Sequence, residues 1–203
     1  AFSLLVLVLG ARAAQAATNA ADALRTGWYP NQPTLTPGLV SGGAFGQLFA
    51  TQLNGQIYAQ PLVANGVLFV ATETNWIYGL DPATGAILWS RNVGTPWNPI
   101  DLGCADLVPS VGITATPVID EATGTAYFTA KTYASGTSGP AAWNMHAVNL
   151  ATGAERPGFP VLIHGGAQNT AQIVFNPTNE LQRPGLLLMD GVVYAGLGGH
   201  CDY

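Results

Sequence analysis

The sequence contains few charged residues. Asp, Glu, Lys and Arg make up 8% of the 203 residues, whereas an ordinary soluble domain carries about 25%. Lys and Arg together number only six, and the formal net charge is −5. A nucleic-acid-binding protein needs a cluster of basic side chains to displace counterions from phosphates, and anionic membrane surfaces attract the same kind of cluster. The composition therefore argues against binding to nucleic acids or to anionic membranes.

The sequence begins with an apolar run that is too short to cross a bilayer. This run covers residues 2–9, whereas a spanning helix needs about 20 residues. Small residues and the pattern Ala14-Gln15-Ala16 follow it, which is typical of the cleavage site of a secretory signal peptide. No Met and no basic stretch come before the run, so we predict that residues 1–16 are a signal peptide lacking its start. A short buried helix is the alternative.

Only two cysteines are present, Cys104 and Cys201. A signal peptide predicts a secreted protein, extracellular or periplasmic, and these compartments are oxidising. A disulfide between the two cysteines is therefore allowed. Because the cysteines are far apart in the sequence, two unpaired thiols remain the alternative.

Glycine and proline, in contrast, are abundant, with 25 and 14 residues. Such a composition means frequent turns and short elements, and it favours many strands over a few long helices. After residues 1–16 we predict an extended N-terminal arm over residues 17–46, which includes a proline-rich stretch. Residues 47–203 then alternate with the period of β-strands.

An internal repeat fills the region 47–203. Three similar units run over residues 60–89, 116–153 and 183–196, and each indicates strands separated by tight turns. Asn65-Gly66 and Asp190-Gly191 are strong hairpin signals because the favoured two-residue turns need positive φ angles. A single four-stranded sheet cannot bury both of its faces, so the copies must stack. We therefore predict an all-β fold, a partial β-propeller of four-stranded antiparallel blades with about three blades, the last incomplete and truncated.

Residues 78–89, YGLDPATGAILW, resemble the blade signature A-x-D-x-x-T-G-x-x-x-W of PQQ-type (quinoprotein alcohol dehydrogenase-like) β-propeller repeat proteins. The residues that carry the resemblance are Asp81, Thr84, Gly85 and Trp89. In that family the closing Trp lies flat between adjacent blades, against a Thr-Gly turn of the neighbour. The second unit keeps this turn as Thr152-Gly153, but it has Asn149 for the Asp and Arg156 near the place of the Trp. The resemblance implies an N-terminal fragment of a secreted bacterial repeat protein.

The same family includes dehydrogenases that hold PQQ and calcium over the propeller axis, and also scaffolds without a cofactor. The dehydrogenases carry a loop with two adjacent Cys, then Asp, then Asn-Arg-Gly, whose Arg approaches the quinone. The comparable loop here, residues 103–112, has Cys104 alone and no Arg. The resemblance thus favours a non-catalytic binding or interaction scaffold whose partners are the remaining blades. The alternative is the N-terminal part of a PQQ-dependent dehydrogenase acting on alcohols or sugars, and only this alternative brings PQQ and calcium.

Candidate ligand-binding residues are expected on one face of the blades. Since successive strands alternate in direction, the loops 73–75, 95–113, 132–142 and 198–203 should share a face, which we call the loop face. Trp97 and Trp143 border it and are candidates for stacking on a flat cofactor, although most such aromatic residues only pack. Asp106 is a further candidate, with a solvated carboxylate as its alternative. The run His200-Cys201-Asp202 lacks the spacing of metal ligands, so we interpret it as a surface loop and predict no metal site. The sequence leaves catalytic residues unassigned.

Overall fold

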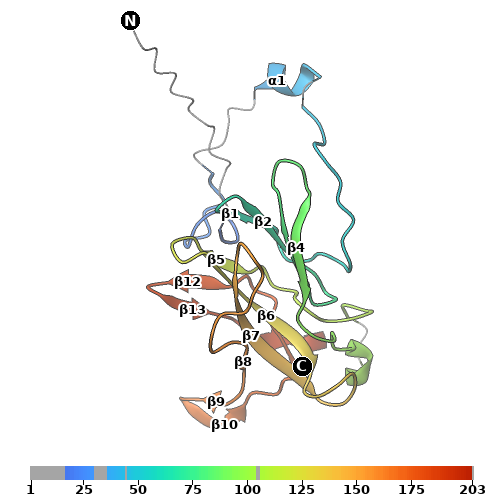
Figure 1. Cartoon of the computed structure of the whole chain (residues 1–203). Helices are drawn as coiled ribbons and strands as arrows, with labels where there is room; N and C mark the ends of the chain where they lie inside the picture. Colours follow the sequence, from blue (N-terminus) through green and yellow to red (C-terminus); the bar gives the residue numbers. More distant parts are fainter. Residues whose placement is uncertain (1–16, 30–35, 44, 104–105, 203) are drawn as a thin grey trace, which may run out of the picture.

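The computed structural model describes residues 17–29, 36–43, 45–103 and 106–202. The predicted signal peptide, residues 1–16, lies outside the described residues, and so does Cys104. Within the predicted arm, a helix of one turn, α1, spans Pro37–Ser41, and the Thr36 side chain caps it by accepting a hydrogen bond from the Leu39 amide. Figure 1 shows α1 apart from the sheets.

Two complete four-stranded antiparallel sheets form the body of the molecule, and we call them the first and second units. In each, the strands pair in sequence order. The first unit consists of β1 Leu62–Ala64, β2 Val67–Ala71, β3 Trp76–Leu80 and β4 Ile87–Asn92. The second unit consists of β5 Val118–Asp120, β6 Thr125–Tyr133, β7 Ala141–Asn149 and β8 Val161–Leu162. The predicted all-β, partial-propeller fold of four-stranded blades is confirmed.

The third unit is a hairpin, and shorter ladders accompany it. Its strands are β12 Leu187–Met189 and β13 Val192–Tyr194. Two further pairs join β9 Gly166–Ala167 to β10 Thr170–Val174, and β11 Glu180–Leu181 to β14 Gly198–Gly199. The 3-10 helices are η1 Pro99–Leu102 and η2 His200–Asp202. Among the described residues the third unit is thus incomplete, as the repeat predicts.

The two complete units stack face to face over a shared hydrophobic core. Phe69 of β2 and Phe128 of β6 meet there, with ring centroids 6.0 Å apart. Trp89 of β4 lies 6.0 Å from Phe69, and its Nε1 donates a hydrogen bond to the Leu150 carbonyl at 3.1 Å. Burial of large aromatic rings is the main source of stability in such a seam.

The Thr-Gly turn of the second unit packs directly on Trp89. Gly153 has a φ of +70°, and a Cβ at this position would lie 2.6 Å from the Trp89 ring. Only glycine satisfies both the left-handed backbone and this contact. The equivalent turn of the first unit is shaped by Asp81, whose Oδ1 accepts hydrogen bonds from the backbone amides of Ala83 and Thr84.

The segment 47–53 covers the other face of the first unit. A Cβ at Gly85 would lie 2.3 Å from the Phe49 ring, and the Thr51 hydroxyl donates to the Gly85 carbonyl at 2.7 Å. Leu53 packs on the cluster of Val70, Tyr78 and Leu80. Although its side chains alternate in exposure, the segment belongs to none of the sheets among the described residues.

These contacts match those of β4 on the second unit. Trp89 packs on Gly153, and two residues later Arg91 Nη1 donates to the Gly153 carbonyl at 3.0 Å. Phe49 and Thr51 have the same spacing and the same relation to Gly85. The segment 47–53 therefore lies against the first unit as the outer strand of a preceding blade would.

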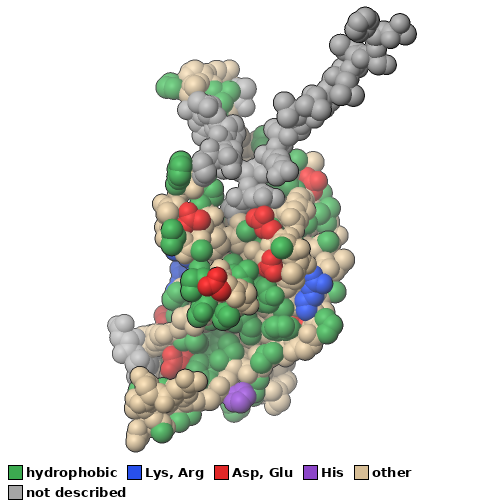
Figure 2. Space-filling view, turned by 90° about the vertical axis from the view of Figure 1, so that its left-hand side faces the viewer, with side chains coloured by type: hydrophobic (Ala, Val, Ile, Leu, Met, Phe, Trp, Pro, Cys, Tyr) green, Lys and Arg blue, Asp and Glu red, His purple; other side chains and the backbone are tan. Residues whose placement is uncertain are grey.

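The face of the third unit that points away from the second is partly uncovered. Leu188 and Val193 pack toward the second unit, whereas Met189, Val192 and Tyr194 are each about half exposed. Figure 2 views the molecule from this side and shows hydrophobic side chains across the middle of the face, with few charged ones.

Candidate functional site

The loops predicted to share one face do lie together. The Glu73 carboxylate accepts hydrogen bonds from the Gly112 amide at 2.7 Å and from the Thr114 hydroxyl at 3.0 Å. Asn75 donates to the Lys131 carbonyl at 2.9 Å, and a β-bridge joins Pro96 to Thr132. On the loop face, loops of the first and second units and of the segment between them therefore contact one another.

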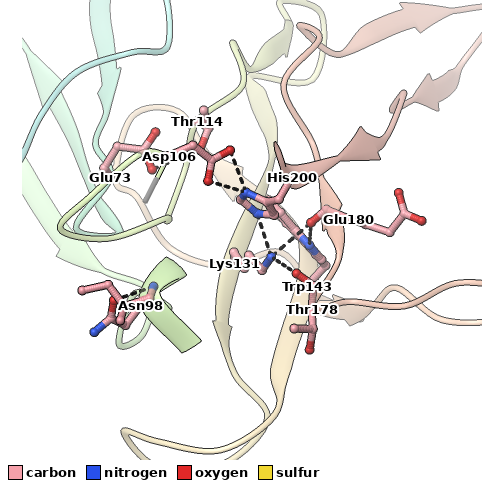
Figure 3. Close-up of polar contacts among 10 residues, drawn as sticks. Glu73, Asn98, Asp106, Thr114, Lys131, Trp143, Thr178, Glu180 and His200 are labelled. Atoms are coloured by element: carbon pink, nitrogen blue, oxygen red, sulfur yellow. Dashed lines mark hydrogen bonds and ion pairs between the residues drawn. The ribbon is translucent and has the colours of Figure 1, made fainter. Parts of the chain in front are cut away.

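Lys131 of β6 lies at the centre of this region. It is the only lysine of the sequence, and it is completely buried. Its Nζ donates hydrogen bonds to the carbonyls of Thr178 at 3.0 Å and Glu180 at 3.1 Å, and it lies 3.0 Å from His200 Nε2. An ammonium group has three N–H donors, so these three acceptors match its full capacity (Figure 3).

Two indole rings flank the same ammonium group. Nζ of Lys131 lies 4.0 Å from the ring centroid of Trp97 and 5.4 Å from that of Trp143. Cation–π contacts of this kind strengthen when they are desolvated, and both rings are buried. Lys131 and Trp143 are direct cross-strand partners in β6 and β7, which places their side chains on one face of the sheet.

His200 connects Lys131 to Asp106. Its Nδ1 lies 3.1 Å from Asp106 Oδ1, and its ring is completely buried. A carboxylate only accepts hydrogen bonds, so Nδ1 carries the proton and Nε2 is left as the acceptor for Lys131. The three side chains form a chain of alternating donors and acceptors from the loop after η1, through η2, to β6 (Figure 3).

Burial shifts the pKa values of the two basic groups. Desolvation lowers the pKa of Lys131 to about 7, against the opposing attraction of Asp106 and Glu180. Desolvation lowers the pKa of His200, and the nearby Lys131 cation lowers it further. Asp106 opposes both effects. Both groups thus bind a proton less readily here than in water.

The structure brings the three predicted cofactor candidates into one cluster. Trp97, Trp143 and Asp106 all surround the Lys131–His200 pair. The Trp143 indole N–H donates to the Glu180 carbonyl at 3.1 Å, and the Trp97 ring also lies 5.8 Å from the His200 ring. Both indoles are therefore engaged within the protein rather than presented at its surface.

The interpretation of His200 as part of a surface loop was wrong. Its side chain is buried because it completes the hydrogen-bonding set of Lys131. Sequence reasoning also missed Lys131. A signal was present, since this lone lysine follows the apolar strand residues Phe128 and Ala130, where a charge needs a partner. Cys201 is not a free thiol, but its predicted partner Cys104 lies outside the described residues, so their pairing stays a prediction.

Glu73 is a second buried ionisable group on the loop face. Burial raises its pKa, against the hydrogen bonds from Gly112 and Thr114. Among the described residues, one carboxylate oxygen, Oε1, has no hydrogen-bond partner, and the same is true of the Asn75 side-chain oxygen. Gly112 is essential to this packing, because a Cβ there would lie 2.4 Å from the Glu73 carbonyl oxygen.

The residues expected to hold a flat cofactor contact other protein groups in this structure. The face of Trp97 is covered by the Lys131 ammonium, and Asp106 is bonded to His200. Within the described ranges, no three His, Cys, Asp or Glu side chains gather as metal ligands. No helix in this part of the chain is long and apolar enough to cross a bilayer.

A small hollow of about 140 Å³ lies at the opposite end of the seam. Asn65 and Val67 of the first unit line it, together with Thr123, Gly124 and the Asn149–Ala151 turn of the second. None of these side chains titrates or is a nucleophile activated by a base, so the hollow offers no catalytic chemistry.

Comparison with known proteins gives short sequence matches. No protein-family profile matches the chain. Over 48 residues it is 44% identical to the dehydrogenase subunit of the quinone alcohol dehydrogenase of Gluconobacter oxydans, which is 24% of this chain and 6% of that subunit. The corresponding subunit of Acetobacter aceti is 40% identical over 50 residues, 25% of this chain and 7% of the subunit. The match thus spans only a small part of these relatives.

Among solved structures, BamB from Moraxella catarrhalis aligns with 72% of this chain and 36% of its own, at 19% identity and a TM-score of 0.47. The sequence matches to the quinone-dependent subunits and the stacked four-stranded units carry the conclusion. Together they confirm that the chain resembles PQQ-like β-propeller proteins and folds as a partial propeller of this type.

Proposed function

We propose that the chain is part of an exported PQQ-like β-propeller that acts as a non-catalytic binding or interaction scaffold. One observation carries this proposal. The residues best suited to hold a flat cofactor on the loop face already bind one another around Lys131. A buried polar cluster in which the donors are matched by acceptors rigidifies the loops that it joins.

The scaffold needs further strands as partners. The segment 47–53 lies like the outer strand of a preceding blade but has no ladder partner among the described residues. The third unit leaves Met189, Val192 and Tyr194 half exposed. Unpaired backbone and uncovered apolar faces favour the docking of another sheet, so we expect additional blades on both sides.

A second candidate function is the N-terminal part of a PQQ-dependent dehydrogenase. The sequence matches to quinone alcohol dehydrogenase subunits favour it. The single Cys104 and the lack of an Arg in the loop 103–112 speak against it. Export to the periplasm or the extracellular space follows from the predicted signal peptide under either function.

Titration of the purified protein with PQQ and Ca²⁺ tests the choice. Intrinsic fluorescence reports binding near Trp97 or Trp143, and dye reduction with ethanol or glucose reports turnover. We expect neither quenching that saturates with PQQ nor PQQ-dependent reduction. Saturable quenching that a Trp97→Phe variant abolishes, together with dye reduction, would instead establish the dehydrogenase.

A further inference from the structure

The hydrogen bonds of the Lys131 ammonium all reach one short structure. Thr178, Glu180 and His200 belong to the ladder β11–β14 with its flanking residues, 178–182 and 198–202, which we call the cover. Trp143 donates to the same Glu180 carbonyl. The cover is therefore held over the two indoles by donors that come from the second unit.

The proton positions in this cluster are fixed by its hydrogen bonds. His200 Nδ1–H donates a hydrogen bond to the Asp106 carboxylate, and the lone pair on Nε2 accepts a hydrogen bond from Lys131. A further proton can bind the His200 ring only at Nε2, which lies 3.0 Å from the Lys131 ammonium. Such protonation replaces a hydrogen bond by two facing N–H groups and places two cations together in a buried site.

We propose that Asp106, His200 and Lys131 form an acid-sensitive clasp, which holds the cover on the second unit and releases it when His200 takes up a second proton. The charged groups that face the pair are Asp106 from the loop after η1 and Glu180 from β11. β7 and the loop before η1 contribute the uncharged rings of Trp143 and Trp97. Both carboxylates are partly exposed, with the Asp106 side chain 33% exposed, so water screens their attraction for a second buried cation.

The direction of the pH effect follows from proton linkage. In the closed state the pKa of His200 is lowered, so the open state binds the proton more tightly. The contribution of His200 to closure is complete above the ordinary His pKa of about 6.5. The clasp weakens as the pH falls below that value, and its opening constant grows by up to about tenfold per pH unit for one proton.

Hydrogen exchange measured by mass spectrometry tests the proposal on the full chain under non-reducing conditions. After correction for intrinsic rates, peptides covering 178–182 and 198–202 should lose protection by about 25-fold between pH 7 and pH 5, the limit for one proton on a group with a pKa near 6.5. This window lies below the pKa of Lys131, which is about 7. Peptides from β2 and β3 should keep their protection. Unchanged protection of the cover, or an equal loss in β2 and β3, would overturn the proposal.

Three variants sharpen this test. In His200→Gln the side-chain amide keeps a donor for Asp106 and an acceptor for Lys131 but does not titrate, so the pH dependence should vanish. Lys131→Met removes the repelling cation and should also flatten the profile, which keeps the proposal testable if the first variant does not fold. His164→Gln changes an exposed histidine outside the cluster and should behave as the wild type. An acid response that persists in His200→Gln and Lys131→Met would contradict the clasp.

Discussion

The seam between the two complete units and the cluster around Lys131 use different kinds of residues. The seam uses residues at repeat positions, such as Trp89 against Gly153, and its contacts recur where Phe49 meets Gly85. The Lys131 cluster uses a lysine that occurs once in the sequence and a histidine from the following segment. The repeat thus determines how sheets stack, while the loops between repeats carry the charged chemistry specific to this chain.

The seam should give the largest loss when it is broken. Trp89→Ala removes a ring that packs on Phe69 and Gly153 and a hydrogen bond to Leu150. We expect the free energy of unfolding to fall by about 3–5 kcal/mol, the usual range for Trp→Ala in a core. Urea denaturation measures this change. Trp28→Ala is the control because Trp28 is 71% exposed, and an equal effect of both variants would contradict the seam.

Loss of a disulfide on the loop face should have the second largest effect on stability. If Cys104 and Cys201 pair, the denatured protein should show no thiol toward Ellman's reagent without reductant. Cys201→Ser should then lower stability by about 2–5 kcal/mol, because the long loop is no longer closed. Two titratable thiols in the unreduced protein would exclude the pairing.

The Lys131 cluster should respond to mutation by a smaller amount. Lys131→Ala leaves the partly buried carbonyl of Thr178 without its Lys131 donor, and the carbonyl of Glu180 with the Trp143 indole as its remaining donor. We expect a loss of about 1–3 kcal/mol, the cost of unsatisfied buried acceptors. Lys131→Met keeps the apolar stem between the two indoles and avoids burying a charge, so its loss should be smaller. If Met destabilises more than Ala, the account of this cluster is wrong.

The smallest expected effect is a pH dependence of stability that comes from the Lys131 cluster and not from the seam. Desolvation lowers the pKa of Lys131 from 10.5 to about 7 in the folded protein, so the unfolded chain binds this proton more tightly. The Lys131 contribution to the free energy of unfolding should therefore rise between pH 7 and pH 10, by at most about 1.4 kcal/mol per pH unit. The difference between wild type and Lys131→Met, measured by urea denaturation at each pH, isolates this slope. Trp89 variants should leave the slope unchanged.

The fold could be predicted from the sequence because its key residues recur at repeat positions. The signals Asn65-Gly66 and Asp190-Gly191 mark two hairpins, and all four residues have the positive φ that such turns need. The signature residues Asp81 and Gly85 mark the turn before β4. These features depend on local chemistry, so single residues suffice to predict them.

The candidate site could be predicted only in part from the sequence. The alternation of strands placed Trp97, Trp143 and Asp106 on one face, and these residues do meet there. Lys131 and His200 join these residues, and they contact each other although they are 69 positions apart in the sequence. No local pattern specifies such a partner, so the sequence alone predicts a surface position for His200.

The central claim is that the indoles of the loop face already bind the Lys131 ammonium. Since Lys131 is the only lysine, ¹³C-lysine labelling gives one side-chain signal in an NMR spectrum. With Nζ 4.0 Å from the Trp97 ring centroid, ring currents should shift the ε-methylene protons upfield, and Trp97→Phe should reduce the shift. An ε-methylene signal at the position of a free, solvated lysine would contradict the account.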